Sequence, residues 1–190
     1  MKKEFLISYL TSEGFSKKTI EAFQNTKRED FVPKEYKSQA YDNIPLPTSQ
    51  CQSISQPYTI AFMLDLLNLK DSSKILEVGS GSGYVLSLIN QISKNSKIYG
   101  LEIIQELVNS SSKVLSENKN IKIIQRDGNK GLEEESPFDR ILVSASSQEI
   151  PKKLLEQLGQ NGIMVCVVKN SILKITKEEY PGFSFVSLTK

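Results

Sequence analysis

A glycine-rich turn between residues 74 and 84 is the feature that most constrains what this chain can fold into. The stretch is KILEVGSGSGY, in which an apolar run leads directly into glycines at alternate positions, Gly79, Gly81 and Gly83. Glycine adopts positive φ at no steric cost and lets a ligand lie against the backbone. The stretch therefore predicts a strand, a turn that holds a small molecule, and a helix whose N-terminus lies above that molecule.

Two acidic residues indicate the kind of ligand. Glu77 lies just ahead of the turn, and Glu102 ends the next apolar run, SKIYGLE. A carboxylate about twenty residues after a glycine turn is placed to accept hydrogen bonds from both hydroxyls of a ribose. The spacing GxGxG differs from the dinucleotide fingerprint GxGxxG, and an acid beside the turn would repel a pyrophosphate but attract a cationic amino-acid group. These features favour S-adenosylmethionine as the cofactor over a turn that only packs helix against strand.

Length and composition suit one soluble domain. The 190 residues carry 24 basic and 22 acidic side chains, a net charge of +2 that is too balanced to indicate nucleic-acid binding. No apolar run approaches the roughly twenty residues of a membrane span, and the N-terminus has no cleavage site of an export signal. We expect a cytoplasmic monomer that binds neither nucleic acid nor membrane, with a single domain made of N-terminal helices and a substrate loop (1–70) and a cofactor-binding core (71–190).

The chain has no histidine, and its two cysteines, Cys51 and Cys166, do not form a metal-ligand spacing. A zinc site of the usual kind and a Ser/His/Asp triad are therefore both excluded. We predict no metal site, and any chemistry must proceed without an imidazole base.

The N-terminal part is predicted to be helical and then irregular. Apolar residues recur at helical spacing before Gly14, and Ser16 is placed to cap a second helix. Residues 27–47 contain three prolines and no sustained period, so we expect an irregular connection anchored by Phe31, Tyr36, Tyr41 and Leu46. A polar loop, 48–56, then precedes a helix that starts at Pro57.

From Lys74 onward the pattern alternates between strand and helix. The expected elements are strand 74–78, helix 82–94, strand 97–102, helix 104–117, strands 121–125 and 138–144, helix 150–158 and strand 162–168. This order predicts an α/β fold of the Rossmann-like class I methyltransferase type, a doubly wound and mostly parallel sheet with an N-terminal helical extension. The last 20 residues suggest a closing hairpin of SILKITK and FSFVSLTK.

Ligands of such sheets bind outside the carboxyl ends of the strands. The loops expected there are 79–83, 102–103, 127–128 and 144–148, with 48–56 as a cover. Asp127 can accept a hydrogen bond from an adenine amine while Gly128 makes room for the ring, although a plain type I turn is the favoured interpretation of Asp127 taken by itself. Asp139 begins a strand, where we expect it to accept from backbone donors.

Several segments, in order, resemble the protein-L-isoaspartate (D-aspartate) O-methyltransferase family. They are KREDFVP, AYDNIPLP, QSISQPY, ILEVGSGSGY, GLE, RDG, PFDRILVSAS and LLEQLGQNGIMV. The resemblance covers roughly residues 20–168. It implies transfer of a methyl group from S-adenosylmethionine to the free carboxylate of L-isoaspartyl residues, after which the ester closes to a succinimide that can reopen as normal aspartate.

The resemblance also implies roles for particular residues. Ser55 takes the place of the active-site hydroxyl, and Ser53 that of a threonine; capping of the following helix is the alternative for these two serines. Glu102 falls at the ribose position, and Gly79 flanks the methionine part. The full predicted cofactor-binding set is Gln52, Ser53, Ile54, Ser55, Ile60, Glu77, Gly79, Ser80, Gly81, Glu102, Ile103, Asp127 and Gly128.

Three departures from the family pattern concern the acceptor. The family loop is close to PIGxGQTIS, whereas Thr48, Ser49 and Cys51 here replace the isoleucine and both glycines. Each lost glycine adds bulk and restricts positive φ. The strand ending VCVVK lacks the usual PVG, and the C-terminal part is short. Two other functions therefore stay open: a carboxyl methyltransferase with another acceptor, and a protein that binds the cofactor without turnover.

Overall fold

The computed structural model describes residues 2–178. Its α-helices are α1 (Lys3–Ser12), α2 (Lys17–Asn25), α3 (Pro57–Leu67), α4 (Tyr84–Ile92), α5 (Gln105–Val114) and α6 (Lys152–Glu156). Its strands are β1 (Leu46–Pro47), β2 (Ser53–Ile54), β3 (Lys74–Val78), β4 (Lys97–Glu102), β5 (Ile121–Gln125), β6 (Phe138–Ser147), β7 (Leu158–Val168) and β8 (Ser171–Thr176). Short 3-10 helices are η1 (Arg28–Asp30), η2 (Lys34–Gln39), η3 (Ser49–Cys51), η4 (Gly128–Lys130) and η5 (Glu133–Glu135).

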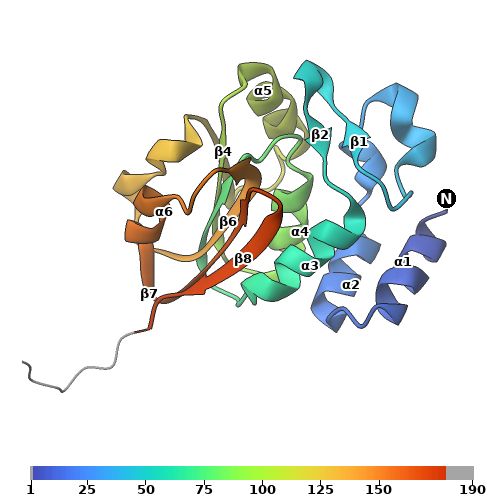
Figure 1. Ribbon diagram of the computed structural model, residues 1–190. Helices are drawn as coiled ribbons and strands as arrows, with labels where there is room; N and C mark the ends of the chain where they lie inside the picture. Colours follow the sequence, from blue (N-terminus) through green and yellow to red (C-terminus); the bar gives the residue numbers. More distant parts are fainter. Residues whose placement is uncertain (1, 179–190) are drawn as a thin grey trace, which may run out of the picture.

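The central sheet has the order β5-β4-β3-β6-β7-β8. All neighbouring strands are parallel except β8, which is antiparallel to β7. The winding direction reverses at β3, because β4 lies on one side of it and β6 on the other. Figure 1 shows this sheet between layers of helices, with the β1–β2 pair separate from it. The predicted doubly wound, mostly parallel sheet is confirmed, and the reversal marks where such folds bind ligands.

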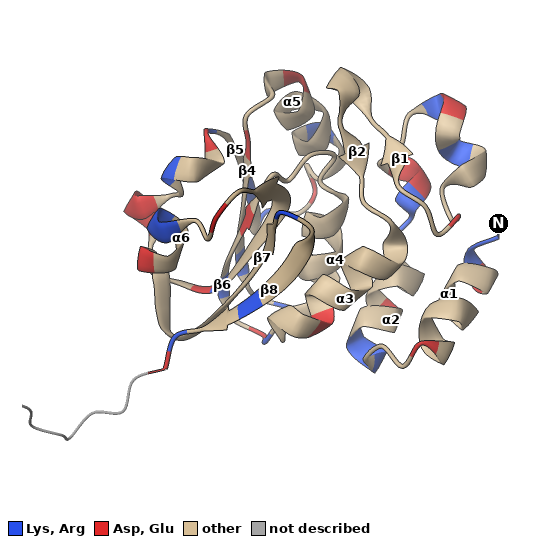
Figure 2. Cartoon of the chain, in the orientation of Figure 1, with Lys and Arg blue, Asp and Glu red and all other residues tan. Residues whose placement is uncertain are grey.

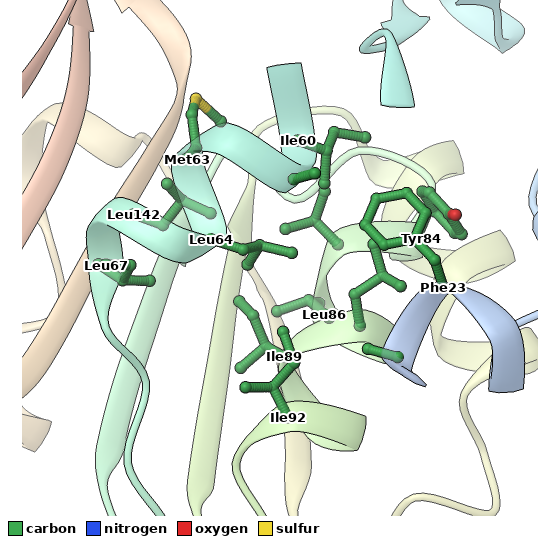
Figure 3. Close-up of a cluster of buried hydrophobic side chains, with 14 of the residues drawn as sticks. Phe23, Ile60, Met63, Leu64, Leu67, Tyr84, Leu86, Ile89, Ile92 and Leu142 are labelled. Carbon is green, nitrogen blue, oxygen red and sulfur yellow. The ribbon is translucent and has the colours of Figure 1, made fainter. Parts of the chain in front are cut away.

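The core has two hydrophobic clusters, one on each face of the sheet. Consecutive residues of β3 point to opposite faces, with Ile75 in the first cluster and Leu76 in the second. Figure 3 shows part of the first cluster, in which side chains of α2, α3 and α4 pack together with Leu142 of β6. The N-terminal helices therefore share a core with the part of the chain that forms the central sheet, because Phe23 packs edge-on against Tyr84.

Local signals in the N-terminal part are confirmed. Ser16 caps α2, since its hydroxyl accepts a hydrogen bond from Thr19 N, and Gly14 follows α1 with φ of +82°. Residues 27–47 contain only η1, η2 and the short β1. The expected aromatic anchors lie partly buried against the core, and Leu46 is fully buried.

Two predicted boundaries near the C-terminal end were wrong. The helix expected over 150–158 is only α6, and β7 begins at Leu158 rather than at residue 162, because Leu158 pairs with Phe138. The SILKITK segment forms β8, which pairs with β7. The FSFVSLTK half of the expected hairpin lies outside the described residues.

The N-terminus of α3 is capped by a side chain from an earlier segment of the chain. Its N-cap residue, Gln56, makes no side-chain cap, and Asn43 Oδ1 accepts from Tyr58 N at 3.0 Å. Helix capping by Ser53 or Ser55, the alternative for these serines, is therefore wrong. Asn43 belongs to the AYDNIPLP segment, so this segment fixes where α3 begins.

The described residues have neither a membrane-spanning helix nor a metal-ligand cluster. Among residues 2–178, no helix has the length and apolarity needed to cross a bilayer. The same residues contain no cluster of three or more His, Cys, Asp or Glu side chains that could hold a metal ion.

Candidate functional site

A cavity of about 420 Å³ lies at the carboxyl ends of β3, β4, β5 and β6. The segment around β2 borders it from the N-terminal part of the chain. Nine of the predicted site residues line this cavity: Gln52, Ser53, Ser55, Gly79, Gly81, Glu102, Ile103, Asp127 and Gly128. Residues separated by more than seventy positions thus meet where the fold predicts a ligand.

A second, smaller cavity of about 50 Å³ adjoins the first. It shares Ser53, Ser55, Gly79 and Gly81 with the larger one. The remaining predicted residues line it: Ile54, Ile60, Glu77 and Ser80. The structure therefore brings the whole predicted set to one continuous site, while the role of each residue stays a prediction.

The glycine turn is held by backbone hydrogen bonds that leave one side open. The amides of Gly79 and Ser80 both donate to Leu101 O, at 2.8 and 3.0 Å. Gly81 has φ of +50°, and no atom lies within 4 Å of where a Cβ would be. A glycine is thus needed here for the backbone conformation, and the space beside it is available to a ligand.

Glu102 connects the turn to the end of β4. Its Oε2 accepts from Gly81 N at 2.9 Å and its Oε1 from Ile104 N at 3.0 Å. A carboxylate oxygen has two lone-pair sites, so each oxygen can still accept one more hydrogen bond. This geometry suits the two adjacent hydroxyls of a ribose, the role predicted for Glu102.

Glu77 is a buried carboxyl with one unpaired oxygen. Its side chain is 1% exposed, Oε1 accepts from Ser144 Oγ at 2.7 Å, and Oε2 has no partner. Burial raises the pKa of Glu77 to about 8, and the negative charge of Glu102 adds to this effect. Ser80 Oγ is likewise buried without a partner.

These orphaned atoms test whether the site fits the predicted cofactor. Buried polar groups without partners are costly and are rare in folded proteins. Glu77 and Ser80 both line the small cavity, so a cationic ligand group with N–H donors would supply the missing partners. The amino-acid end of S-adenosylmethionine has this chemistry, so the residues present fit it.

Ligand-free stability should depend on the protonation of Glu77. Because its folded pKa of about 8 exceeds the ordinary value of 4.5, the folded state binds this proton more tightly than the unfolded state. The stabilising contribution is complete below pH 4.5 and is lost as pH rises toward 8. We expect thermal denaturation to show a steeper loss of stability over this range in the parent protein than in Glu77→Gln, which cannot titrate there.

Cofactor binding should reverse this shift, because a cation beside Glu77 favours its charged form. Calorimetry at pH 7 in two buffers of different ionisation enthalpy should detect release of up to one proton per cofactor bound. Glu77→Gln should release none from this site. A binding enthalpy that does not depend on the buffer would contradict the assignment.

The N-terminal side of the cavity is formed by the segment of β1, η3 and β2 and by two serines, Ser53 and Ser55. β1 and β2 pair through Leu46 with Ile54 and Pro47 with Ser53, and η3 lies between them. Within residues 2–178, neither Ser53 Oγ nor Ser55 Oγ has a hydrogen-bond partner. Both hydroxyls border the cavity beside the glycine turn, where they are available to a ligand.

The lost freedom at positive φ matters at only one of the two replaced glycines. Cys51 has φ of +55°, a left-handed conformation that costs a non-glycine residue about 1–2 kcal/mol, whereas Ser49 is outside that region. Cys51→Gly should therefore raise the free energy of unfolding by up to about 1 kcal/mol after the entropic cost of glycine. Ser49→Gly is the matched control and should lower it by about 0.5–1 kcal/mol. Chemical denaturation measures both, and equal changes would contradict the account.

Asp127 and Gly128, which were predicted to contact adenine, also make contacts within the protein. Asp127 Oδ1 accepts from Asn129 N at 3.0 Å and from Asn129 Nδ2 at 3.1 Å, which caps η4. A Cβ on Gly128 would lie 2.3 Å from Val78 Cγ1, so packing within the protein already requires glycine there. Both residues nevertheless line the larger cavity, and the second carboxylate oxygen of Asp127 is not used by Asn129.

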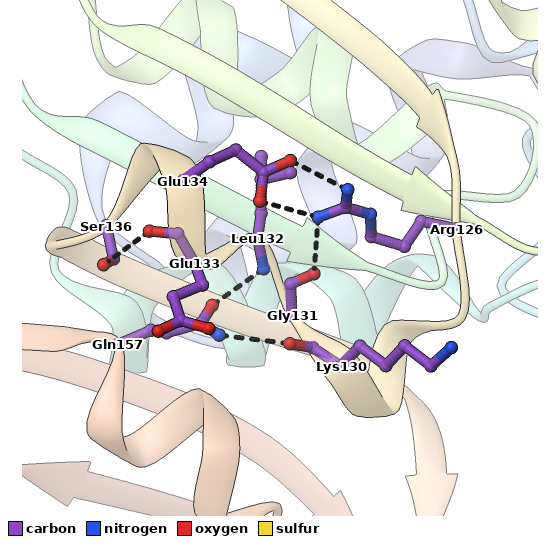
Figure 4. Close-up of polar contacts among 8 residues, drawn as sticks. All are labelled: Arg126, Lys130, Gly131, Leu132, Glu133, Glu134, Ser136 and Gln157. Atoms are coloured by element: carbon purple, nitrogen blue, oxygen red, sulfur yellow. Dashed lines mark hydrogen bonds and ion pairs between the residues drawn. The ribbon is translucent and has the colours of Figure 1, made fainter.

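The segment after Asp127 is anchored by two side chains (Figure 4). Gln157 Oε1 accepts from Leu132 N at 2.8 Å, and its Nε2 donates to Lys130 O at 3.1 Å. Arg126 Nη1 donates to Glu134 Oε2 at 2.8 Å and to Gly131 O at 3.4 Å. These contacts fix the loop that presents Asp127 to the cavity.

A groove of about 710 Å³ lies beside this anchored segment and shares Arg126 and Asp127 with the cofactor cavity. The groove is lined by charged side chains of both signs, and Figure 2 shows basic and acidic residues together around α6. It lacks the glycine turn and the apolar walls of the cavity. The chemistry therefore favours the 420 Å³ cavity, rather than this groove, as the cofactor site.

Sequence reasoning missed two contributions to the site. Ser144 was expected to end strand 138–144 and begin loop 144–148, without a role in the site, but β6 extends to Ser147, and Ser144 donates to Glu77. Arg28 was not singled out, yet it is fully buried and donates to Ser55 O at 3.0 Å. The run KREDFVP was used only for the family resemblance, and its local pattern does not show that Arg28, rather than the adjacent Lys27, is buried.

Comparisons with known sequences identify the family of the chain. The family model described as protein-L-isoaspartate (D-aspartate) O-methyltransferase matches residues 1–182. A protein-L-isoaspartate O-methyltransferase of Fervidobacterium nodosum is 45% identical over 178 residues, which are 90% of this chain and 88% of that protein. Protein-L-isoaspartate O-methyltransferase 2 of Archaeoglobus fulgidus is 40% identical over 175 residues, 90% of this chain and 80% of that protein.

Two solved structures share the fold of this chain. A Plasmodium falciparum protein described as a putative protein-L-isoaspartate O-methyltransferase, in complex with S-adenosyl-L-homocysteine, superimposes with a TM-score of 0.77 at 28% identity. The match covers 100% of this chain and 99% of that one. Another protein-L-isoaspartate O-methyltransferase has a TM-score of 0.84 at 24% identity, and the match covers 94% of this chain and 61% of that longer one. The chain belongs to the protein-L-isoaspartate (D-aspartate) O-methyltransferase family.

Proposed function

We propose that this protein transfers the methyl group of S-adenosylmethionine to the free carboxylate of L-isoaspartyl residues in damaged proteins and peptides, as an enzyme of protein repair. The observation that carries the proposal is the meeting of Ser55 with the Gly79–Gly81 turn and Glu102 around one cavity. A donor site and an acceptor hydroxyl are needed at the same place, and these residues supply both.

The cofactor is held by residues of the β3 and β4 ends in this proposal. Glu102 accepts hydrogen bonds from the ribose hydroxyls, Glu77 and Ser80 bind the amino-acid end, and Ile103 lies against the adenine with Asp127 and Gly128 at its edge. Ile103 is 63% exposed and lines the larger cavity, so a bound ring would cover it. When bound, S-adenosylmethionine supplies a methyl group on a positively charged sulfur.

The acceptor needs no general base. A carboxylate has an ordinary pKa near 4, so it is already ionised at neutral pH, and one of its oxygens forms the new bond to the methyl carbon as the carbon–sulfur bond breaks. This chemistry agrees with a chain that has no histidine. The protein must orient the acceptor and exclude water, which is how positioned reactants gain rate.

Ser55 performs the orienting in this proposal. Its hydroxyl donates a hydrogen bond to one acceptor oxygen and leaves the other oxygen directed at the methyl carbon. Ser53 and Gln52 border the same opening and complete the wall on the acceptor side.

A methyl-transfer assay tests the proposal. Radiolabelled S-adenosylmethionine should label a peptide with one L-isoaspartyl residue and leave the same peptide with normal aspartate unlabelled. No transfer above the aspartyl control would reject the isoaspartyl assignment.

The altered loop favours one second candidate, a carboxyl methyltransferase with another acceptor. Cys51 is exposed and strained at a position where the family pattern has glycine, so the loop can select a different peptide context. Profiling of methyl acceptors in a cell extract separates this candidate from the first. Tight cofactor binding without transfer to any acceptor would instead favour a binding protein.

The remaining expectations also stay proposals. We propose a single-domain monomer of the cytoplasm that binds no nucleic acid and no membrane. The shared core of the N-terminal helices and the sheet supports one domain, and the net charge of +2 supports the absence of a nucleic-acid partner.

A further inference from the structure

Arg28 is the most buried charged residue near the site. Its side chain is 0% exposed, and burial lowers the pKa of its guanidinium. Burying a charged group is expensive unless hydrogen bonds compensate for the lost water. The contacts that provide this compensation indicate what the residue holds in place.

The guanidinium donates to four backbone carbonyl oxygens. Nη1 contacts Ala40 O at 3.0 Å and Asp42 O at 3.2 Å. Nη2 contacts Ile44 O at 3.3 Å and Ser55 O at 3.0 Å. One planar group therefore joins the segment that enters β1 to the residue that follows β2, and the β1–β2 loop is closed at its base by Arg28.

Arg28 also contacts the donor side of the site. Its Cζ lies 5.8 Å from the ring centroid of Tyr84, a distance that permits a cation–π contact. Tyr84 is the first residue of α4, directly after the glycine turn, and lines the small cavity with Ser53 and Ser55. The position of Tyr84 in the core is visible in Figure 3. Arg28 thus lies between the segment that carries Ser55 and the turn predicted to hold the methyl donor.

We propose that Arg28 is a positioning residue for methyl transfer, which sets the place of Ser55 relative to the glycine turn. The inference rests on the proposed function of Ser55. Arginine is needed because its fork of five N–H donors in one plane can reach several carbonyls at once, whereas the ammonium group of lysine is a compact point charge. Substitution by lysine keeps the charge and removes the bridge.

The chain offers a matched control in Arg140. This residue is 4% exposed, burial lowers its pKa, and it too donates to backbone carbonyls, from Nε to Asn68 O at 3.1 Å and from Nη1 to Asp139 O at 2.7 Å. It lies near the start of β6, away from the carboxyl ends that border the cavity. Both Arg28→Lys and Arg140→Lys should lower the melting temperature.

Activity should separate the two variants. Measured well below either melting temperature, Arg28→Lys should lower kcat for an isoaspartyl peptide at least tenfold and change the Kd of S-adenosylhomocysteine less than threefold. Arg140→Lys should change both less than twofold. Equal losses in the two variants, or no loss in Arg28→Lys, would overturn the proposal.

A double-mutant cycle tests whether Arg28 acts through Ser55. In a Ser55→Ala background the Arg28→Lys change should cost little further activity, because coupled residues are not additive. The same tenfold loss in that background would show that Arg28 supports the fold only. If Arg28→Lys does not fold, Arg28→Gln takes its place in the cycle.

Amide hydrogen exchange tests the positioning role of Arg28 without a methyl acceptor. Amides of residues 40–55 should exchange faster in Arg28→Lys than in the parent protein or in Arg140→Lys. If the parent protein does not methylate isoaspartyl peptides, the proposed function fails, and the exchange result still decides whether Arg28 orders this segment. Unchanged exchange in Arg28→Lys would overturn the positioning role.

Discussion

Ser55→Ala is expected to lower kcat/KM for an isoaspartyl peptide by about 10- to 150-fold, the equivalent of one hydrogen bond to a charged group worth about 1.5–3 kcal/mol. The hydroxyl has no partner within residues 2–178, so its removal breaks no contact in the free protein. The folded state should therefore keep its melting temperature. Only the orientation of the acceptor carboxylate is lost.

Cofactor affinity shows whether Ser55 orients the acceptor or binds the cofactor. The Kd of S-adenosylhomocysteine, measured by calorimetry, should change less than threefold in Ser55→Ala. Ser55→Thr keeps a hydroxyl and should recover most of the activity. Equal losses of transfer and cofactor affinity in Ser55→Ala would instead place Ser55 among the cofactor contacts.

Glu102→Ala is expected to weaken cofactor binding by about 10- to 150-fold, because it removes a charged acceptor for the ribose hydroxyls. The loss of cofactor affinity has a second cause, which is the loss of two backbone hydrogen bonds to Glu102. Gly81 N and Ile104 N both donate to this carboxylate, so its removal also frees the glycine turn and the end of β4. Calorimetric titration with S-adenosylhomocysteine measures the change.

Glu102→Gln separates the two causes. The amide keeps the size of the side chain and one acceptor oxygen, so it can satisfy only one of the two backbone donors. Its affinity should fall between those of the parent protein and Glu102→Ala, with a smaller drop in melting temperature. An unchanged affinity in Glu102→Ala would show that the ribose lies elsewhere.

The sheet and the location of the site could be predicted because they depend on local patterns. Apolar runs of five or six residues followed by helical periods specify parallel strands with crossover helices. The position of Glu102 follows from its place at the end of such a run. Since strands of this fold end at the same edge, residues distant in the sequence were expected to meet, and they do.

The boundaries near residue 158 could not be predicted in this way. The LLEQL segment has the apolar spacing of a helix, yet β7 begins at Leu158 because its backbone pairs with Phe138 across the sheet. Gln157, next to it, is engaged by the loop around Leu132. Pairing and side-chain contacts from other segments decide where such a helix ends, and local propensity does not include them.

By itself, the amino-acid sequence indicated the glycine turn and the carboxylates beside it, because these depend on backbone freedom and residue chemistry at fixed spacing. The serines of the 48–56 loop were indicated only by the resemblance to a known family. Only the tertiary structure decided that Glu77 keeps an unpaired oxygen and that Arg28 holds Ser55. Both depend on burial and on hydrogen bonds between distant segments. A charged residue has the same sequence signature whether it lies in water or in the core, and its surroundings in the fold determine its effect.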